Sequence, residues 1–173
     1  NYATIKQVNL DNINSTAKKL PITFYPTPTE ENYELGVMIR YFAKVINQNK
    51  WVEINEETYG KLLSKDDNWL WKHYNIYKLQ WTLTGKEDEV SEANRTEIQI
   101  LEQFGKVTGL SLYLQLNYTQ FYLGEIQENL ETKGQEYLLP DGTEYIGFYH
   151  IHPTKGAMVG KFHTKTPHSS LTP

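Results

Sequence analysis

The sequence contains no cysteine, and this absence excludes several classes of site at once. A chain without thiols forms no disulfide, offers no thiolate nucleophile and holds no zinc ion or iron–sulfur cluster through cysteine. The absence suits a protein of a reducing cytoplasm. Any metal site must therefore be built from histidine and carboxylate ligands.

Long apolar runs and a strong net charge are also missing. No apolar stretch approaches the roughly 20 residues that a membrane-spanning helix needs, so we expect no membrane partner. The formal net charge is −4 over 173 residues. A negatively charged chain is not attracted to duplex DNA or to an anionic membrane, and we expect no direct contact with nucleic acid.

Aromatic residues, by contrast, are plentiful. They make up 13% of the chain and include 13 tyrosines and 4 tryptophans. Tyrosine and tryptophan combine a large apolar body with a polar tip, so they are enriched in the buried parts of protein interfaces. A tyrosine-rich core is the alternative, and composition alone leaves both interpretations open.

Residues 29–49 have the clearest helical pattern. Thr27 to Glu30 looks like a capping box with proline at the first helical position. Apolar side chains then recur every three or four residues, which predicts an amphipathic helix of about four to five turns ending near Asn49. Its apolar face would contain Leu35, Met38, Ile39, Phe42, Val45 and Ile46.

Shorter elements complete the expected body. Residues 51–54 alternate like a strand, Asn55 can cap a second helix, and residues 76–84 are typical of a strand that Gly85 ends. A third helix is expected from about Lys86 to Gly105, with an apolar edge at Val90, Ala93, Glu97, Leu101 and Phe104. The pattern of residues 110–124 fits a strand or a helix, and both stay open.

The last third of the chain predicts a β-meander. Strands are expected at 136–139, 143–152 and 157–164, with turns at Pro140-Asp141-Gly142 and at 153–156. The predicted class is α+β, with helices packed on a small mixed sheet, a C-terminal antiparallel β-meander and an extended N-terminal arm. The expected parts are an arm at 1–28, an α+β body at 29–125, and a meander unit with a C-terminal tail at 126–173.

Four of the five histidines lie within nineteen residues, at positions 150, 152, 163 and 168. His150 and His152 are two apart on a predicted strand and so point to the same face. Imidazole nitrogen binds zinc and iron, which makes His150, His152 and His163 the candidate metal ligands. A single-chain site requires His163 to return to that face, which the sequence does not fix. A His-x-His strand repeated about a symmetry axis would give an intermolecular site. Hydrogen-bonded structural histidines are the favoured alternative, and we expect no cofactor.

The segment from Gly147 to Pro153 resembles the Gly-x-x-His-x-His-Pro core of the JAMM metallopeptidases. In that family, two histidines and a downstream aspartate bind zinc, and a serine lies in the same downstream segment. No aspartate follows Asp141 here, so the third protein ligand is missing. Catalytic zinc sites ordinarily use three protein ligands and a water. We therefore expect no enzyme and keep a metal-binding or JAMM-like zinc hydrolase module as the alternative.

Three tryptophans suggest one further class. The rings of Trp69, Trp71 and Trp81 are of the kind that stacks on sugars. The strand pattern around them also supplies an apolar core or interface for such rings to fill, and we favour that interpretation. A carbohydrate-binding module remains a third hypothesis.

The C-terminal third is similar to a motif of virion structural proteins of tailed bacteriophages, notably marine and cyanobacterial ones. That motif reads roughly Gly-x-x-Tyr-x-Gly-x-Tyr-His-x-His, followed by a glycine turn and a second glycine. In this chain it is carried by Gly142, Tyr145, Gly147, Tyr149, His150, His152, Gly156 and Gly160. Residues 34–44 and 117–122 are also similar. The resemblance implies a particle component with no catalytic residues.

The resemblance also implies partners and a place in the cell. We expect a neck, tail or baseplate subunit that joins other virion structural proteins through its arm, aromatic surface and meander. It would form a homo-oligomer in a symmetric assembly and be located in the virion after assembly in the host cytoplasm. The expected interface residues are Tyr145, Phe148, Tyr149, Met158 and Phe162.

Overall fold

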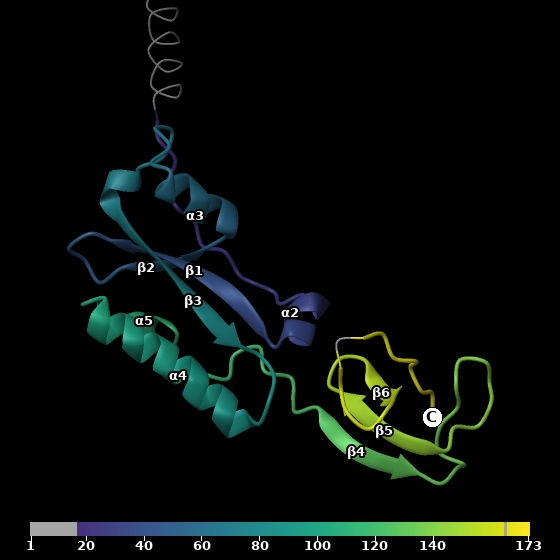
Figure 1. Ribbon diagram of the computed structural model, residues 1–173. Helices are drawn as coiled ribbons and strands as arrows, with labels where there is room; N and C mark the ends of the chain where they lie inside the picture. Colours follow the sequence, from purple (N-terminus) through teal and green to yellow (C-terminus); the bar gives the residue numbers. More distant parts are fainter. Residues whose placement is uncertain (1–16, 165) are drawn as a thin grey trace, which may run out of the picture. The chain divides into compact units, whose positions relative to one another are not determined.

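The computed structural model describes residues 17–164 and 166–173. Most of the predicted arm at 1–28 lies outside the described residues. The described part contains four α-helices and two three-stranded antiparallel sheets, which confirms the α+β class (Figure 1). The sheet that was expected to be mixed is antiparallel. None of the helices in this part is both long enough and apolar enough to cross a membrane.

The chain divides into two compact units. The first contains the described residues up to Pro26, together with Arg40–Leu79 and Thr108–Tyr113. The second contains Thr27–Ile39, Gln80–Val107 and Leu114–Pro173. Two strands, β1 (Val37–Val45) and β3 (Tyr74–Thr82), continue from one unit into the other.

A short helix followed by a strand replaces the long helix expected over 29–49. Helix α2 (Glu30–Leu35) begins at Thr29, whose side chain accepts a hydrogen bond from the Asn32 N–H, and it ends at Gly36. Gly36 has a φ of 76°, the left-handed conformation that commonly ends helices. Strand β1 then buries alternate residues, among them Met38 and Phe42. The helix prediction was wrong beyond Leu35 because β-branched and aromatic residues after this stop favour a strand.

The first sheet has the strand order β2-β1-β3, and β2 spans Trp51–Ile54. The predicted strand at 51–54 is thereby confirmed, and the strand predicted at 76–84 is β3. Helix α3 (Glu56–Leu63) begins at Asn55, whose side chain accepts a hydrogen bond of 2.8 Å from the Thr58 N–H, as predicted. The buried core of the first unit is formed by Ala43 of β1, Ile54 of β2 and Leu62 of α3.

A buried ion pair joins β1 to β2. The guanidinium of Arg40 donates from Nε and Nη2 to the two carboxylate oxygens of Glu53, each at 2.8 Å. Arg40 is only 1% exposed and Glu53 only 6%. Charges buried to this degree are tolerated when they are paired and hydrogen-bonded, and loss of one partner is costly. The pair therefore ties the stability of the sheet to one register.

Helix α4 (Glu87–Phe104) confirms the third predicted helix, but a different stripe of it is buried. Its buried residues are Val90, Asn94 and Ile98. The Asn94 side chain accepts from the Thr82 N–H at 2.7 Å and donates to the carbonyl oxygens of Thr82 and Tyr118. The predicted edge was wrong at Phe104, which is exposed. The polar Asn94 takes a buried position because it satisfies backbone groups at the end of β3.

Two short helical turns lie between the larger elements. The 3-10 turn η1 (Trp71–His73) precedes β3, and α5 (Leu110–Tyr113) is a single α-helical turn. Residues 110–124, for which strand and helix both remained open, contain α5 followed by turns and no strand. This segment is held in part by the Trp81 indole, whose N–H donates to the Gln120 carbonyl at 2.9 Å.

The second sheet has the order β4-β5-β6 expected of an antiparallel meander. Its strands are β4 (Gln127–Thr132), β5 (Gly147–His152) and β6 (Gly156–Val159). Two of the expected strands are shorter than predicted, since β5 begins at Gly147 and β6 ends at Val159. The turn at Pro140-Asp141-Gly142 is confirmed by a hydrogen bond from the Gly142 N–H to the Leu139 carbonyl.

One meander strand was predicted in the wrong place. Residues 136–139 form no strand of the sheet, and Leu138 makes only isolated bridges, to Glu144 and Thr172. Strand β4 takes the outer position instead. Its sequence, Gln-Glu-Asn-Leu-Glu-Thr, lacks the apolar alternation from which a strand is predicted. Pairing with β5 therefore creates a strand that local sequence does not favour.

We predict that Glu53→Gln destabilises the protein by about 3–5 kcal/mol, because it leaves the Arg40 charge buried without its carboxylate. The measurement is the free energy of unfolding in urea. The partly exposed ion pair between Lys61 and Asp66 supplies the control. Lys61→Met should cost less than about 1 kcal/mol, and an equal cost for both variants would contradict the role given to the buried pair.

A second prediction concerns the stop at Gly36. Gly36→Ala should destabilise the protein by about 1–2 kcal/mol, because the added Cβ lies 2.7 Å from Thr84 Oγ1 at a φ of 76°. Gly60, inside α3, is the matched control, since a Cβ there meets nothing within 4 Å. Gly60→Ala should stabilise by about 0.5–1 kcal/mol. Thermal unfolding shows whether each variant is less or more stable than the unchanged chain. A Gly36→Ala variant that is more stable would refute the role of Gly36 in ending helix α2.

Candidate functional site: the histidine cluster and the apolar surfaces

Strand β5 places His150 and His152 on one face of the second sheet. The two residues are two apart in a regular strand, so their side chains share a face, as predicted. Both are buried, with exposures of 0% and 1%. They lie opposite Met158 and Gly156 of β6.

The chain after β6 brings two further histidines to this place. The ring of His163 lies 5.4 Å from that of His150 and 5.1 Å from that of His152, between ring centroids. The ring of His168 lies 5.1 Å from that of His150. One ligand nitrogen from each of His150, His163 and His168 lies within 4.8 Å of the other two. The return of His163, which the sequence left open, therefore takes place within one chain.

The metal ligands predicted from the sequence were His150, His152 and His163. The structure brings the first and the third together with His168, and it leaves His152 beside them. His168 was part of the sequence pattern but not of the predicted ligand set. Only its closeness in sequence to His163 pointed to it, since no helix or strand period relates the two residues.

Hydrogen bonds orient the two histidines of β5. His150 Nδ1 lies 2.9 Å from the Gly160 carbonyl oxygen, and a carbonyl only accepts, so Nδ1 carries the proton and Nε2 has a lone pair. His150 Nε2 lies 3.4 Å from His163 Nδ1. His152 Nδ1 lies 2.8 Å from Thr154 Oγ1. Its Nε2 is buried and has no hydrogen-bond partner among the described residues.

Burial governs the charge of the cluster. It lowers the pKa of the His152 imidazole, and the neighbouring His163 and Lys155 act in the same direction. It also lowers the pKa of His163, again with help from neighbouring histidines, whereas Glu128 and Glu34 act against the shift. Both rings are therefore neutral at neutral pH, which is the state in which imidazole binds metals.

A cavity of about 460 Å³ opens beside His163 and His168. Helix α2 contributes Glu34 to its wall, and the turn before β6 contributes Lys155. Lys155 forms an ion pair with Glu34, which lowers the pKa of that carboxyl group and raises the pKa of the lysine. The cavity gives small molecules access to two of the four rings.

The match to the JAMM pattern is incomplete at the third metal ligand. That family requires an aspartate as the third ligand, and none follows Asp141. Here His163 and His168 gather around His150 instead. The resulting donor set contains only imidazole nitrogen, so the zinc hydrolase alternative gains no ligand that its family pattern specifies.

The predicted interface residues of the meander are divided between surface and interior. Phe148 and Phe162 are exposed, and they share one cation, since Lys161 Nζ lies 4.9 Å and 5.5 Å from their ring centroids. These two rings therefore belong to one surface. Ile146, also exposed, precedes β5 by one residue.

The other three predicted interface residues are less accessible. Met158 is 6% exposed and lies in the interior of the second unit. Tyr149 is half-buried with its ring 4.9 Å from that of Tyr137, and Tyr145 is half-buried with its hydroxyl donating to the Phe148 carbonyl. We therefore define the meander surface as Ile146, Phe148 and Phe162.

The three tryptophans considered for sugar stacking form no common platform. Trp81 is fully buried, and its indole N–H is hydrogen-bonded. Trp69 lies beneath Lys19, whose Nζ is 5.8 Å from the ring centroid. Trp71 lines a different cavity. The carbohydrate hypothesis therefore loses the stack of three rings on which it depended.

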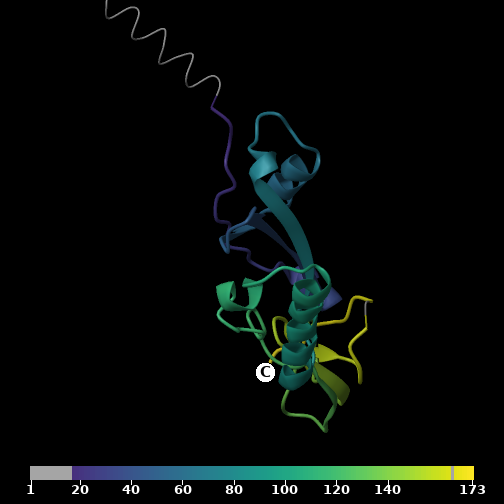
Figure 2. The ribbon, with the colours of Figure 1, turned by 90° about the vertical axis from the view of Figure 1, so that its left-hand side faces the viewer.

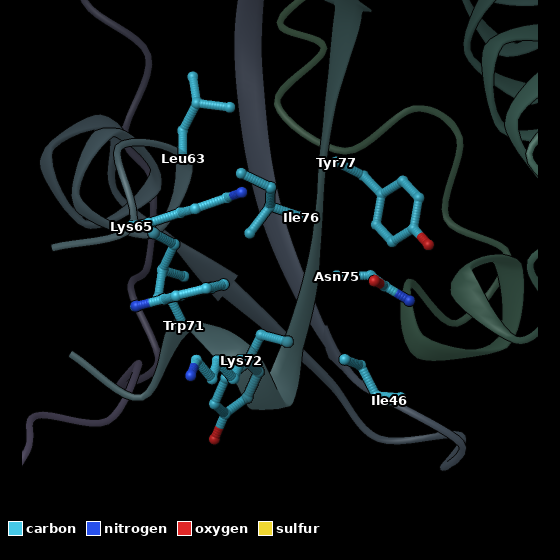
Figure 3. A pocket seen from close by; sticks show the side chains of 10 residues that line it. Ile46, Leu63, Lys65, Trp71, Lys72, Asn75, Ile76 and Tyr77 are labelled. Atoms are coloured by element: carbon cyan, nitrogen blue, oxygen red, sulfur yellow. The ribbon is translucent and has the colours of Figure 1, made fainter. Parts of the chain in front are cut away.

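Trp71 belongs to a groove of about 560 Å³ in the first unit (Figure 3). One side is formed by η1 and the loop before it, and the other by β3, which contributes Ile76 and Tyr77. Figure 3 shows the Lys65 side chain extending across the groove toward Ile76. The amines of Lys65 and Lys72 each lie 5.3 Å from the Trp71 ring centroid. The groove is therefore lined by apolar and aromatic side chains together with two lysines.

A comparison of the chain with known protein families, curated proteins and solved structures finds no match. The resemblance to phage virion proteins therefore remains a prediction. What the chain does has to be inferred from the geometry of its own surfaces and of its histidines.

Proposed function

We propose that this chain is a structural subunit of a tailed-phage particle, in its neck, tail or baseplate, and that it joins neighbouring subunits. The observation that carries the proposal is the segment 20–25, which is extended and exposes four large apolar side chains. Ile22 is 76% exposed and Tyr25 is 83% exposed, and Leu20 and Phe24 are exposed as well.

Four exposed apolar side chains within six residues indicate that another protein binds over this segment. Single exposed apolar residues are normal on a soluble protein, whereas contiguous ones mark interaction sites. Isoleucine, threonine, phenylalanine and tyrosine favour strands, and an extended segment pairs readily with a strand of another chain. Tyrosine and phenylalanine are among the side chains enriched at protein interfaces.

The backbone of this segment is held in place although its side chains are exposed. The Lys19 carbonyl accepts from the Leu70 N–H at 3.0 Å, and the Phe24 N–H donates to the Glu53 carbonyl at 2.8 Å. Figures 1 and 2 show the segment as an extended trace without helix or strand. A segment fixed at both ends loses less conformational entropy on binding than a free one. It is thus suited to docking on a neighbour.

The two other apolar surfaces support the same function. The meander surface exposes Ile146, Phe148 and Phe162, and the groove of the first unit exposes apolar side chains beside Lys65 and Lys72. A subunit that joins several neighbours needs more than one interaction surface. Homo-oligomeric contacts and contacts with other virion proteins both fall within the proposal.

The phage-like motif also agrees with a structural function. Its glycines at 147, 156 and 160 have φ values of 144°, 75° and 110°. Side chains other than glycine rarely adopt such conformations. These motif glycines are therefore required by the backbone path of the meander, and no catalytic function needs to be invoked for them.

The test replaces the two most exposed side chains of the segment. The double variant Ile22→Lys with Tyr25→Lys should fold normally, since neither side chain is buried. Its incorporation into phage particles, measured by quantitative mass spectrometry of purified particles, should fall by about 10-fold or more, as expected for central interface residues.

The control is Leu112→Lys, which places one lysine at a residue that is 69% exposed in the first unit. Its incorporation should equal that of the unchanged chain. Equal incorporation of the double variant would refute the role of the segment. Absence of the unchanged chain from purified particles would refute the proposed function as a whole.

A further inference from the structure

Four histidines converge at one place in the second unit, and this convergence calls for an explanation that subunit joining does not supply. Three of them offer ligand nitrogens within 4.8 Å of one another. They come from two separate segments, β5 and the chain after β6. We propose that His150, His163 and His168 bind one divalent transition-metal ion, which fastens the C-terminal segment to β5.

The spacing of the nitrogens fits such an ion. Zinc–nitrogen bonds of about 2.0–2.1 Å in a tetrahedral site place neighbouring ligand nitrogens about 3.3 Å apart. His150 Nε2 and His163 Nδ1 lie 3.4 Å apart. His150 is fixed by burial, whereas His163 and His168 are half-buried. The three ligand nitrogens lie within 4.8 Å of one another, so His163 and His168 have to move toward His150 when the ion binds.

An outer contact selects the tautomer of His150. His150 donates Nδ1–H to the Gly160 carbonyl and thereby directs the lone pair of Nε2 at His163. A backbone carbonyl in this position is a frequent outer partner of metal-bound histidine. His168 Nε2 lies 3.0 Å from the Thr164 carbonyl and 3.2 Å from the Thr164 N–H, so its contacts are compatible with either tautomer. One of the three ligands, His150, is thus oriented before any ion arrives.

His152 lies beside the three ligands but is not one of them. Its side chain is 1% exposed, and its Nε2 has no hydrogen-bond partner in the described part of the chain. The Thr154 N–H donates to His152 Nδ1 at 3.2 Å, so Nδ1 has the lone pair of the neutral ring and Nε2 carries the proton. The lone pair of His152 is therefore already used by Thr154, and the ligand set stays at His150, His163 and His168.

The donor set defines the class of ion. Imidazole nitrogen suits zinc, ferrous iron, cobalt, nickel and copper, whereas magnesium and calcium prefer oxygen ligands. The cavity beside His163 and His168 leaves room for a water or another small ligand on the ion. The inference is independent of the proposed function, because a purified chain binds or does not bind the ion whatever its partners are.

Zinc is the probe for the test. The full chain is treated with a chelator, dialysed and titrated with zinc chloride in a calorimeter. One zinc ion should bind per chain, and an equal excess of magnesium should give no signal. Free zinc at 100 times the dissociation constant should raise the melting temperature by about 5–10 °C.

Variants assign the ligands. His163→Gln and His168→Gln remove half-buried rings and should each weaken zinc binding by at least about 10-fold. His73→Gln is the matched control, because His73 is exposed, lies in the first unit and is the one histidine outside the cluster. Its affinity should equal that of the unchanged chain. Circular dichroism checks that each variant is folded.

Two results would overturn the inference. One is the absence of stoichiometric zinc binding, or binding that His163→Gln and His168→Gln leave unchanged. The other is one zinc ion shared by two or three chains with a matching change in mass in solution, which would make the site intermolecular. Imidazole NMR signals of the unchanged chain give a readout that does not depend on variants. Zinc should shift the signals of His150, His163 and His168 and leave that of His73 in place.

Discussion

The buried pair of Arg40 and Glu53 is the constraint on which the first unit depends. In the β1–β2 pairing, Glu53 lies opposite Phe42, and Arg40 reaches it from two residues along the strand. Because side chains alternate between faces, a slip of one residue would turn one of these groups to the opposite face. The pair therefore admits one register, and the same register places Ala43 and Ile54 in the core with Leu62 of α3.

Elements with strong local signals were predicted from the sequence. Asn55 begins α3 as expected, α4 lies where its spacing placed it, and the turn at Asp141 forms. Residues 37–45 were predicted to be helical and form strand β1 instead. Their apolar spacing fits a helix, whereas their β-branched and aromatic residues favour a strand. The left-handed Gly36 decides between the two, and β4 is a strand only through its pairing with β5.

The same distinction applies to the histidines. The shared face of His150 and His152 follows from the period of a strand and was predicted. The approach of His163 and His168 depends on the path of the chain after β6, where Gly160 has a φ of 110° and its carbonyl accepts a hydrogen bond from His150 Nδ1–H. No local pattern encodes that path. One backbone group thus both turns the chain and orients a proposed metal ligand.

The proposed assembly subunit combines a well-ordered interior with exposed apolar segments that are suited to contacts with neighbours. The interior comes from the buried ion pair, the hydrogen-bonded Asn94 and the proposed metal link, and the exposed apolar parts are the segment 20–25 and the meander surface. An electron cryomicroscopy map of the phage particle tests this account most directly. It should show Ile22 and Tyr25 covered by a neighbouring subunit. A map in which the segment 20–25 faces solvent in every copy of the chain would contradict the account.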